Sequence, residues 1–509
     1  MKDSLLSALE NIARSHYKNG EYAQALSAWL ELSQNFPKRD DYLISCGNCF
    51  DALGDKKAAV KYYLKAHKLN KKSLPALTNL ATACYEIDDL KASEKYSRLA
   101  LKLDLQSLPA LINLGNVLYR QKNYTAALQY YRQAAELKPE YYVAEINLAN
   151  TYFDLRDYEA AAHHAAIAAS LDSLSVQART LLGNSAMETD DFDKALAAFS
   201  DALKLDSSDP WIYNYLSQAC QKKSLWKEAI ENGWQAVEKS DGDEAHHINF
   251  GYLLYEAALA DIDSFVHSYA QKWLEKYPEN PVVMHMGKAL SDGHSAHVAP
   301  PDYVRDIFDV FATDFEQVLH GLEYRAPELI FGFLKEIYGE KKHPKMRILD
   351  AGCGTGLCGG FLKKYASFGG LEGVDLSAGM LKEAALKKVY NRLIRKEIVE
   401  WLGGVKSRYD LVVSADVFTY IGDLKNLFTV LFAALKKDGR VIFTVSENSE
   451  NDSDWFLHIS GRFLHSRKYI ENLLLKTGFE LEKISREKLR NEGDSEVWGY
   501  VVSARKKRS

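Results

Sequence analysis

Small and large apolar residues recur along the first half of the chain with a period of about 34 residues. Two antiparallel helices need small residues where their backbones cross and large residues in the holes between them. The pattern therefore predicts helix pairs, which must stack into a solenoid because one pair cannot bury its apolar face alone. The small residues are Ala13, Gly47, Ala81, Gly115, Ala149, Gly183, Ser217 and Gly251, and the large residues include Trp29, Tyr63, Tyr131 and Phe199.

Each unit of this pattern resembles the tetratricopeptide repeat, with about seven units in register from Ser4 to Asp243 and a degenerate eighth reaching Pro281. The proline that usually closes a unit is kept only at Pro37 and Pro139, which loosens the predicted helix ends but not the period. The resemblance implies a concave groove lined by the first helix of each unit.

Asparagines recur on these first helices in two rows that lie three residues apart and so share one helical face. An amide side chain carries a donor and an acceptor, so such a ladder can bind the backbone of an extended peptide. The alternative is that some of these side chains cap or brace neighbouring repeats, but bracing would not need both rows. We expect peptide binding by Asn48, Asn79, Asn113, Asn116, Asn147, Asn150 and Asn184.

The periodicity changes after a polar, proline-terminated stretch at residues 291–301, which we interpret as a linker between a solenoid at 1–290 and a second domain at 302–509. In that domain short β-rich runs alternate with helical ones, which predicts a doubly wound parallel sheet. The expected strands are 346–350, 370–375, 409–414 and 440–445, and the expected helices 357–365, 378–389, 424–435 and 467–477. A closing hairpin is expected from strands 479–484 and 497–503, joined across the polar segment 486–495.

A glycine-rich turn, Asp350-Ala-Gly352-Cys-Gly354-Thr-Gly356, lies where the first strand of this domain gives way to a helix. The glycines let the backbone approach a ligand, and the helix N-terminus offers free N–H groups. An acid before the first glycine suits the ammonium group of a methionine moiety and would repel a pyrophosphate. Asp375 ends the next strand, where a carboxylate can accept both hydroxyls of a ribose. A dinucleotide-binding fold is the alternative.

Together these residues resemble class I S-adenosylmethionine-dependent methyltransferases, and the whole chain is similar to bacterial members fused to tetratricopeptide repeats. The narrower resemblance rests on a lid helix at 303–311 followed by Phe315, on 460–466, on Leu489-Arg490 and on Gly499-Tyr500. It implies a cofactor site at Asp350, Gly352, Gly354, Gly356, Asp375, Leu376, Glu397, Ile398 and Arg325. Within that set, Glu397 and Ile398 would meet the adenine and Arg325 the cofactor carboxylate. A surface acid and a lid-anchoring ion pair are the alternatives for Glu397 and Arg325.

Methyl transfer is an in-line displacement from a sulfonium, so the protein chiefly aligns the acceptor and excludes water. Asp416 and Val417 follow the fourth-strand region and are expected near the transferred methyl group. Candidates for a base, needed only for a protonated acceptor, are Glu447, His465 and Tyr420, although a structural role is favoured for each of them. No Asn-Pro-Pro-Tyr signature follows this strand, which disfavours an amide or nucleobase acceptor.

Composition narrows the function further. The net charge of -5, with the acidic excess in residues 1–300, argues against a dedicated nucleic-acid binder. The six cysteines form no disulfide framework and fit a reducing compartment. Cys46-x-x-Cys49 has no second pair at zinc spacing, so we assign no metal site. No apolar run is long enough for a membrane span, and we expect a cytoplasmic protein without nucleic-acid or membrane partners.

The sequence thus favours an S-adenosylmethionine-dependent methyltransferase that modifies a protein or peptide held in the groove of the repeats. One alternative keeps the enzyme but gives it a small-molecule acceptor, for which the aromatic lid residues Phe308, Phe311 and Phe315 would be suited, with the repeats serving assembly. Another is a non-enzymatic scaffold with a relic methyltransferase fold. The acceptor, its atom and the oligomeric state are left open.

Overall fold

The chain is described by a computed structural model over residues 2–291, 297–339, 346–366, 370–492 and 495–507, so part of the expected linker lies outside the described residues. The chain separates into two compact units, Met1–Lys223 and Ser224–Ser509. This division falls within the helical repeats. The last repeats therefore belong to the same unit as the α/β fold.

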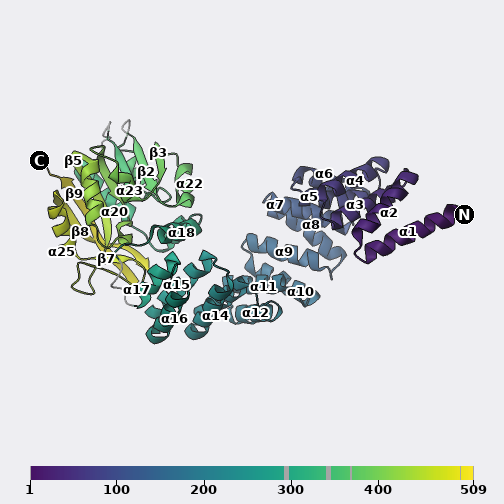
Figure 1. The fold of residues 1–509 in the computed structure, drawn as a ribbon, viewed down its shortest axis with the longest axis horizontal. Coiled ribbons are helices and arrows are strands. Elements are labelled where there is room, and N and C mark those ends of the chain that lie inside the picture. The colour runs from purple at the N-terminus through teal and green to yellow at the C-terminus, as the bar shows by residue number, and fades with distance from the viewer. Residues whose placement is uncertain (1, 292–296, 340–345, 367–369, 493–494, 508–509) are drawn as a thin grey trace. The chain divides into compact units, whose positions relative to one another are not determined.

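The first unit consists of antiparallel helix pairs, drawn from purple to blue in Figure 1. Its helices are α1 (Lys2–Lys18), α2 (Tyr22–Asn35), α3 (Asp40–Ala52), α4 (Lys56–Leu69), α5 (Leu74–Glu86), α6 (Leu90–Leu103), α7 (Leu108–Arg120), α8 (Tyr124–Leu137), α9 (Tyr142–Asp154), α10 (Tyr158–Leu171), α11 (Val176–Glu188), α12 (Phe192–Leu205) and α13 (Pro210–Lys222).

The turn within each pair is set by a repeated capping residue. The side chains of Asp55, Asp89, Asn123, Asp157 and Asp191 each accept a hydrogen bond from the backbone N–H three residues later. Such a bond satisfies one of the free donors at the start of a helix. The second helix of each of these pairs therefore begins at a fixed point of the sequence period.

Close helix crossings explain the small residues of the period. A Cβ added to Gly115 on α7 would lie less than 3.0 Å from ring atoms of Tyr131 on α8. Gly47 faces Tyr63 and Gly183 faces Phe199 in the same way. The aromatic rings fill the space that the glycines leave. This packing confirms the expected helical solenoid.

The second unit continues with helices and then forms one sheet. Its helices are α14 (Trp226–Lys239), α15 (Glu244–Leu259), α16 (Asp263–Lys276), the π-helical turn η1 (Val283–Gly287), α17 (Lys288–Ser291), α18 (Pro301–Phe311), α19 (Phe315–Gly321), α20 (Ala326–Tyr338), α21 (Gly359–Leu362), α22 (Ala378–Leu386), α23 (Ile398–Gly403), the 3-10 turn η2 (Phe418–Tyr420), α24 (Lys425–Ala434) and α25 (Arg467–Lys476). Its strands are β1 (Ile348–Ala351), β2 (Leu371–Asp375), β3 (Arg392–Arg395), β4 (Tyr409–Ser414), β5 (Leu435–Glu447), β6 (Trp455–Leu457), β7 (Phe463–His465), β8 (Phe479–Glu492) and β9 (Ser495–Lys506).

The sheet is the expected doubly wound one. Its order is β3-β2-β1-β4-β5-β7-β6, and β1 to β5 run parallel. Side chains alternate between its faces: Leu349 and Val412 pack toward α23, α24 and α25, whereas Ile348 and Leu411 pack toward α20 and α21. Both faces are thus covered by helices, as a parallel sheet requires.

Two parts of the sheet differ from expectation. The closing hairpin is present, but β8 extends to Glu492, so most of the segment predicted to join the two strands is itself paired strand. The polar composition of this segment led to its prediction as a connection. Strand pairing, however, is made by backbone groups, so the outer side chains of β8 can be polar and stay in contact with water. The short antiparallel pair β6–β7 was not predicted; it adds to the sheet beside β5.

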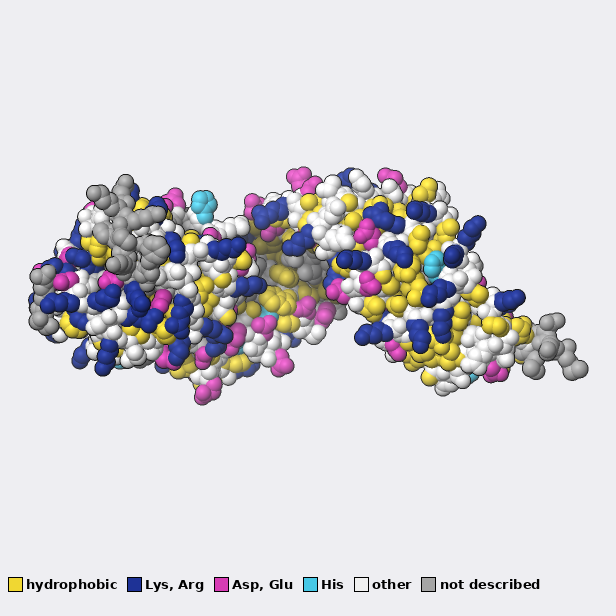
Figure 2. Space-filling view, turned by 90° about the horizontal axis from the view of Figure 1, so that it is seen from above, with side chains coloured by type: hydrophobic (Ala, Val, Ile, Leu, Met, Phe, Trp, Pro, Cys, Tyr) yellow, Lys and Arg dark blue, Asp and Glu magenta, His cyan; other side chains and the backbone are white. Residues whose placement is uncertain are grey.

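The last repeat packs against the α/β fold within the second unit. His285 of η1 donates from Nε2 to the carbonyl of Gly461, at 2.7 Å, and Tyr303 of α18 donates to the sulfur of Met286, at 3.2 Å. On the α/β fold, at the left of Figure 2, Lys and Arg side chains are spread over the face shown. Among the described residues, no helix has the length and apolarity needed to cross a membrane.

Candidate functional site

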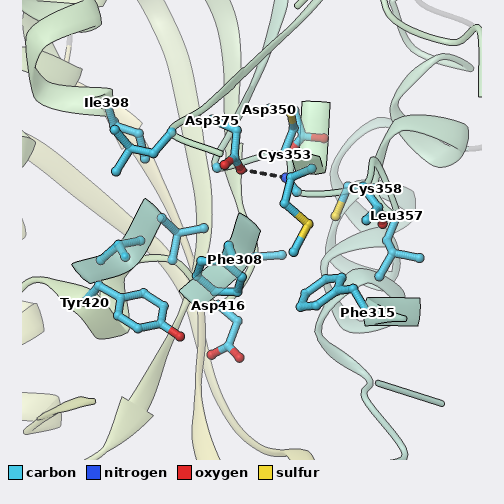
Figure 3. A pocket seen from close by; sticks show the side chains of 18 of the residues that line it. Phe308, Phe315, Asp350, Cys353, Leu357, Cys358, Asp375, Ile398, Asp416 and Tyr420 are labelled. Atoms are coloured by element: carbon cyan, nitrogen blue, oxygen red, sulfur yellow. Dashed lines mark hydrogen bonds between the residues drawn. The ribbon is translucent and has the colours of Figure 1, made fainter. Parts of the chain in front are cut away.

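A cavity of about 240 Å³ opens at the carboxyl ends of β1, β2 and β4. Ligands of open α/β sheets bind at this edge, beside the two neighbouring strands from which the chain continues toward opposite sides of the sheet. The glycine-rich turn after β1 forms one wall, and the lid helices α18 and α19 form another. Figure 3 shows Asp350 and Asp375 on one side of this space and Phe308, Phe315, Asp416 and Tyr420 on the other.

Asp350 is buried at the base of the cavity, with 1% of its surface exposed. Burial raises its pKa to about 7, and a hydrogen bond from the hydroxyl of Tyr390, at 2.6 Å, opposes that shift. Gly356 does not line the cavity; a Cβ there would lie 2.9 Å from the ring of Tyr390. This glycine therefore acts through Tyr390, which it allows to reach Asp350.

The turn between β1 and α21 needs its glycines. Gly352, Gly354 and Gly356 have φ values of 72°, 52° and 88°, in the left-handed region that favours glycine. A Cβ on Gly352 would also lie less than 3.0 Å from side-chain atoms of Val417, the residue that follows Asp416. The glycine-rich turn and the end of β4 thus touch, and both line the cavity.

Asp375 is oriented by backbone groups at the end of β2. Its Oδ2 accepts from the N–H of Gly354, at 2.8 Å, and its Oδ1 accepts from the N–H of Ser377, at 3.0 Å. Each oxygen keeps a lone pair, since a carboxylate has about four acceptor positions. Burial raises the pKa of Asp375, and the backbone hydrogen bonds oppose that shift. The carboxylate is therefore preset to accept two further hydroxyl groups.

The remaining candidates for cofactor binding divide into two groups. Leu376, Glu397 and Ile398 line the cavity, and Glu397 also caps α23 by accepting from the N–H of Glu400 at 2.7 Å. Arg325 is not among the lining residues, and its side chain is exposed. Its backbone N–H instead donates to the carbonyl of Leu489, at 2.8 Å. The structure therefore does not bring Arg325 to the cavity.

The lid is held over the glycine-rich turn by polar contacts. Asp309 of α18 accepts from the side chain of Ser377 and from the N–H of Gly379, and Glu316 of α19 accepts from Thr355 at 2.6 Å. The lid residues Phe308 and Phe315 line the cavity with their rings edge to face, 5.9 Å apart. Phe311, expected beside them, instead packs on Tyr252 of α15.

The opposite wall carries a chain of charged groups. Asp416, at the end of β4, has a φ of 56° and accepts from Nη1 of Arg490 on β8, at 2.6 Å. Arg462, in the turn between β6 and β7, donates from Nη1 to Glu492 at 2.9 Å. Asp416, Arg462 and Arg490 all line the cavity.

Neither of the other two catalytic candidates lies among the cavity-lining residues. Although burial acts in the opposite direction, hydrogen bonds from Arg486 and Tyr500 lower the pKa of Glu447. His465 is buried, and its Nε2 donates to the carbonyls of Ile421 and Gly422, at 2.9 and 3.0 Å. Burial lowers the pKa of His465 to about 4. Both side chains brace the strand ends, and the structure leaves neither in reach of an acceptor in the cavity.

The asparagine rows of the repeats are bonded to neighbouring repeats. Asn79 donates to Asn48 at 2.9 Å, and Asn147 donates to Asn116 at 3.2 Å, so each brace joins the two rows. The premise that bracing would need only one row is therefore wrong. The other bonds are Asn113 to Thr82 at 2.9 Å, Asn150 to the carbonyl of Ile146 at 2.8 Å, and Asn184 with Tyr215.

Sequence reasoning assigned no role to Tyr390, Arg462 or Arg490. Arg462 and Arg490 stand in segments that carried the family resemblance, and this was the only sign in the sequence that they could be functional. Tyr390 stands in no motif, and its contact with Asp350 arises from the tertiary fold alone.

Comparison with known proteins places families on both halves of the chain. A model described as a methyltransferase domain matches residues 322–484. Models described as tetratricopeptide repeats match residues 11–72, 109–141 and 146–210. The first range contains the glycine-rich turn, Asp375 and Asp416, and the others contain the helix pairs of the first unit.

Similar proteins include human methyltransferase-like protein 27, 38% identical over 95 residues, and malonyl-(acyl-carrier protein) O-methyltransferase of Priestia megaterium, 32% identical over 106 residues. These matches cover 18% and 20% of this chain, and the chain spans 38% of the length of each relative. The crystal structure of the APC/C hetero-tetramer Cut9–Hcn1 is similar with a TM-score of 0.41 and 16% identity, over 47% of this chain and 48% of that chain. The chain therefore combines tetratricopeptide repeats with a class I methyltransferase domain.

Proposed function

We propose that the chain is an S-adenosylmethionine-dependent methyltransferase. The observation that carries this proposal is the pair of carboxylates at the cavity, Asp350 in β1 and Asp375 at the end of β2, with the glycine-rich turn donating to Asp375 through the N–H of Gly354. One acid suits the ammonium group of such a ligand, and an acid at the end of the next strand suits the hydroxyls of its ribose. The methyltransferase domain matched over residues 322–484 supports the same reaction class.

The residues present fit this cofactor. Asp375 would hold the two ribose hydroxyls with the lone pairs that Gly354 and Ser377 leave free, and Asp350 would pair with the ammonium group. Glu397 and Ile398 would bind the adenine, where Glu397 keeps an oxygen beyond the one that caps α23. The glycines let the backbone pass close to the ligand.

S-adenosylmethionine, when bound, supplies a methyl group on a positively charged sulfonium. Phe308 and Phe315 on the lid exclude water from this space, and the lid is fixed by Asp309 and Glu316. Asp416 and Val417 stand between the cofactor loop and the opposite wall, which is where an acceptor would be aligned.

We further propose that the acceptor is a protein or peptide recruited by the repeats. Tetratricopeptide repeats commonly present a groove to an extended partner, and the models of such repeats match the first unit. Except for the buried Asn113, these asparagines are partly exposed, although their hydrogen bonds use part of their capacity. A small-molecule acceptor is the second candidate, favoured by the aromatic lid above the cavity.

Calorimetry on the full chain tests the cofactor. We expect one molecule of S-adenosylmethionine to bind, and Asp375→Ala to weaken binding roughly 10- to 100-fold, because hydrogen bonds to a charged group contribute about 1.5–3 kcal/mol. Asp452→Ala is the matched control, since Asp452 is an exposed aspartate in the loop between β5 and β6. No binding by the unaltered chain, or equal binding by Asp375→Ala, would exclude both enzymatic functions and leave a scaffold.

Methyl transfer in cell lysate separates the acceptor classes. Labelled S-adenosylmethionine and the purified chain are added to lysate of a strain that lacks this protein. Label in a protein band supports a protein acceptor, and label in an extractable metabolite supports a small molecule. The Asp375→Ala chain serves as the background.

A further inference from the structure

Two arginines of the cavity wall have more donors than the structure uses. Arg490 on β8 has a side chain that is only 2% exposed, and Arg462 after the β6–β7 turn is 22% exposed. A guanidinium carries five N–H donors. Within the described residues, Arg462 donates to Glu492 alone, and Nε of Arg490 has no partner. Both arginines line the cavity, and Arg462 is the more accessible of the two.

The charges of this wall balance without a ligand. Asp416 is paired with Arg490, and Glu492 lies 2.9 Å from Nη1 of Arg462 and 3.6 Å from Nη2 of Arg490. The formal charges of the two guanidinium groups and the two carboxylates sum to zero. A bound sulfonium adds one positive charge, which a single anionic group on the acceptor would neutralise in a site of low dielectric.

The position of Arg462 is fixed by its neighbours. Its carbonyl accepts from the N–H of His458 at 2.9 Å, and the carbonyl of the preceding Gly461 accepts from His285 of the last repeat at 2.7 Å. Gly461 has a φ of 74°, and a Cβ there would collide with Met286 and Tyr303. The backbone of Arg462 is therefore held by contacts of the β6–β7 turn with η1 and α18, and its guanidinium is held by Glu492.

Of the three candidates for a base, only Tyr420 lines the cavity, and a neutral phenol is a poor proton acceptor. Glu447 and His465 lie outside it, and the carboxylate of Asp416 is held by Arg490. An acceptor that is already deprotonated near neutral pH needs no base. A carboxylate satisfies this condition, and its two oxygens match the planar donors of a guanidinium.

We propose that the methyl acceptor carries a carboxylate that Arg462 and Arg490 bind and that is itself methylated, an inference that rests on the proposed methyltransferase function. One lone pair of the carboxylate oxygen forms the new O–CH3 bond as the S–CH3 bond breaks. The bonding pair stays on sulfur, giving a methyl ester and neutral S-adenosylhomocysteine. No proton is transferred, so this step needs no base.

The stability of the transferred methyl group toward alkali tests the product. Methyl esters release volatile methanol in mild alkali, whereas methyl groups on nitrogen do not. The full chain is incubated with labelled S-adenosylmethionine and lysate, and we expect the label to become volatile after alkali treatment. Label that stays with the acceptor would overturn the proposal. No transfer at all, with cofactor binding absent in calorimetry, would count against the proposed function itself.

Binding of phenylacetate to the full chain saturated with S-adenosylhomocysteine tests the arginine. We expect phenylacetate to bind more tightly than the neutral phenylacetamide, and Arg462→Gln to weaken phenylacetate alone by tenfold or more. Arg467→Gln is the matched control, because Arg467 pairs with Glu471 on the exposed face of α25. Arg462→Lys keeps the positive charge but lacks the planar pair of N–H donors, so its affinity for phenylacetate should be intermediate.

Unchanged affinity for S-adenosylhomocysteine shows that the Arg462 variants are folded. If Arg462→Gln fails this check, Arg462→Lys is used in its place. Equal binding of phenylacetate and phenylacetamide, or no effect of the substitution, would overturn the proposal. Tighter binding of phenethylamine would overturn it in favour of an amine acceptor bound by Asp416.

Discussion

At the scale of single residues, Asp350 is the group whose charge depends most directly on its environment. The carboxyl is buried beneath the cavity, burial raises its pKa to about 7, and Tyr390 donates to it. Its ionised form is the one that can pair with an ammonium group. Around neutral pH the free chain therefore contains both a form that can make this ion pair and a form that cannot.

Cofactor affinity should consequently depend on pH. The raised pKa keeps Asp350 neutral below about pH 7 and lets it ionise above, so binding should tighten as pH rises, roughly fivefold to tenfold from pH 6 to pH 7.5. Calorimetry at several pH values measures this slope. Asp350→Asn should bind more weakly and with a flatter pH profile. A slope as steep in that variant as in the unaltered chain would contradict the assignment.

The residues of the site differ in how far sequence could reveal them. Asp350, the glycines and Asp375 follow strand ends, so local pattern places them at one edge of the sheet. Glu447 and His465 also end strands, yet the side chain of Glu447 turns to Arg486 and that of His465 to the two backbone carbonyls that follow η2. A position at a strand end determines the edge of the sheet at which a residue lies, but not the direction of its side chain. Tyr390, Arg462 and Arg490 depend on contacts between distant segments.

At the scale of elements, the helix pairs show why the repeat period was predictable. Five pairs begin their second helix at a capping Asp or Asn, and Gly47, Gly115 and Gly183 each face a ring. These are local requirements, so they recur in the sequence. The asparagine braces obey the same period, which is why periodicity alone did not separate bracing from ligand binding.

Replacing one crossing glycine should destabilise the repeats. Gly115→Ala inserts a methyl group into the ring of Tyr131, and overpacking of this kind costs about 1–3 kcal/mol. Urea denaturation followed by circular dichroism measures the loss. Gly332→Ala on α20 is the control, because nothing lies within 4 Å of the added Cβ there and alanine favours a helix. Equal stability of the two variants would show that the crossing is less close than described.

At the scale of the whole molecule, the last repeats and the methyltransferase fold share one compact unit. His285 and Met286 of η1 contact Gly461 and Tyr303, next to the wall that carries Arg462. Burial lowers the pKa of His285 to about 4, so it contacts Gly461 as a neutral donor near neutral pH. The final helices thus pack against the part of the unit that carries the cavity.

Truncation should therefore depend sharply on where the chain is cut. A chain beginning at Ser224 keeps η1 and should bind S-adenosylmethionine within a few-fold of the full chain. A chain beginning at residue 291 loses His285 and Met286, and should bind weakly or fail to fold. Calorimetry and thermal unfolding compare the two. Full affinity in the shorter chain would show that η1 is dispensable.

The bond between His285 and Gly461 bears on how such a chain can be recombined. A fusion joined at the polar stretch before α18 would pair a foreign final repeat with a hairpin turn shaped for η1. A junction near residue 223 would replace the helix pairs of the first unit and leave the contact between η1 and the β6–β7 turn intact. Gene shuffling of this architecture, in nature or in the laboratory, should tolerate new repeats upstream of α14 and resist them downstream.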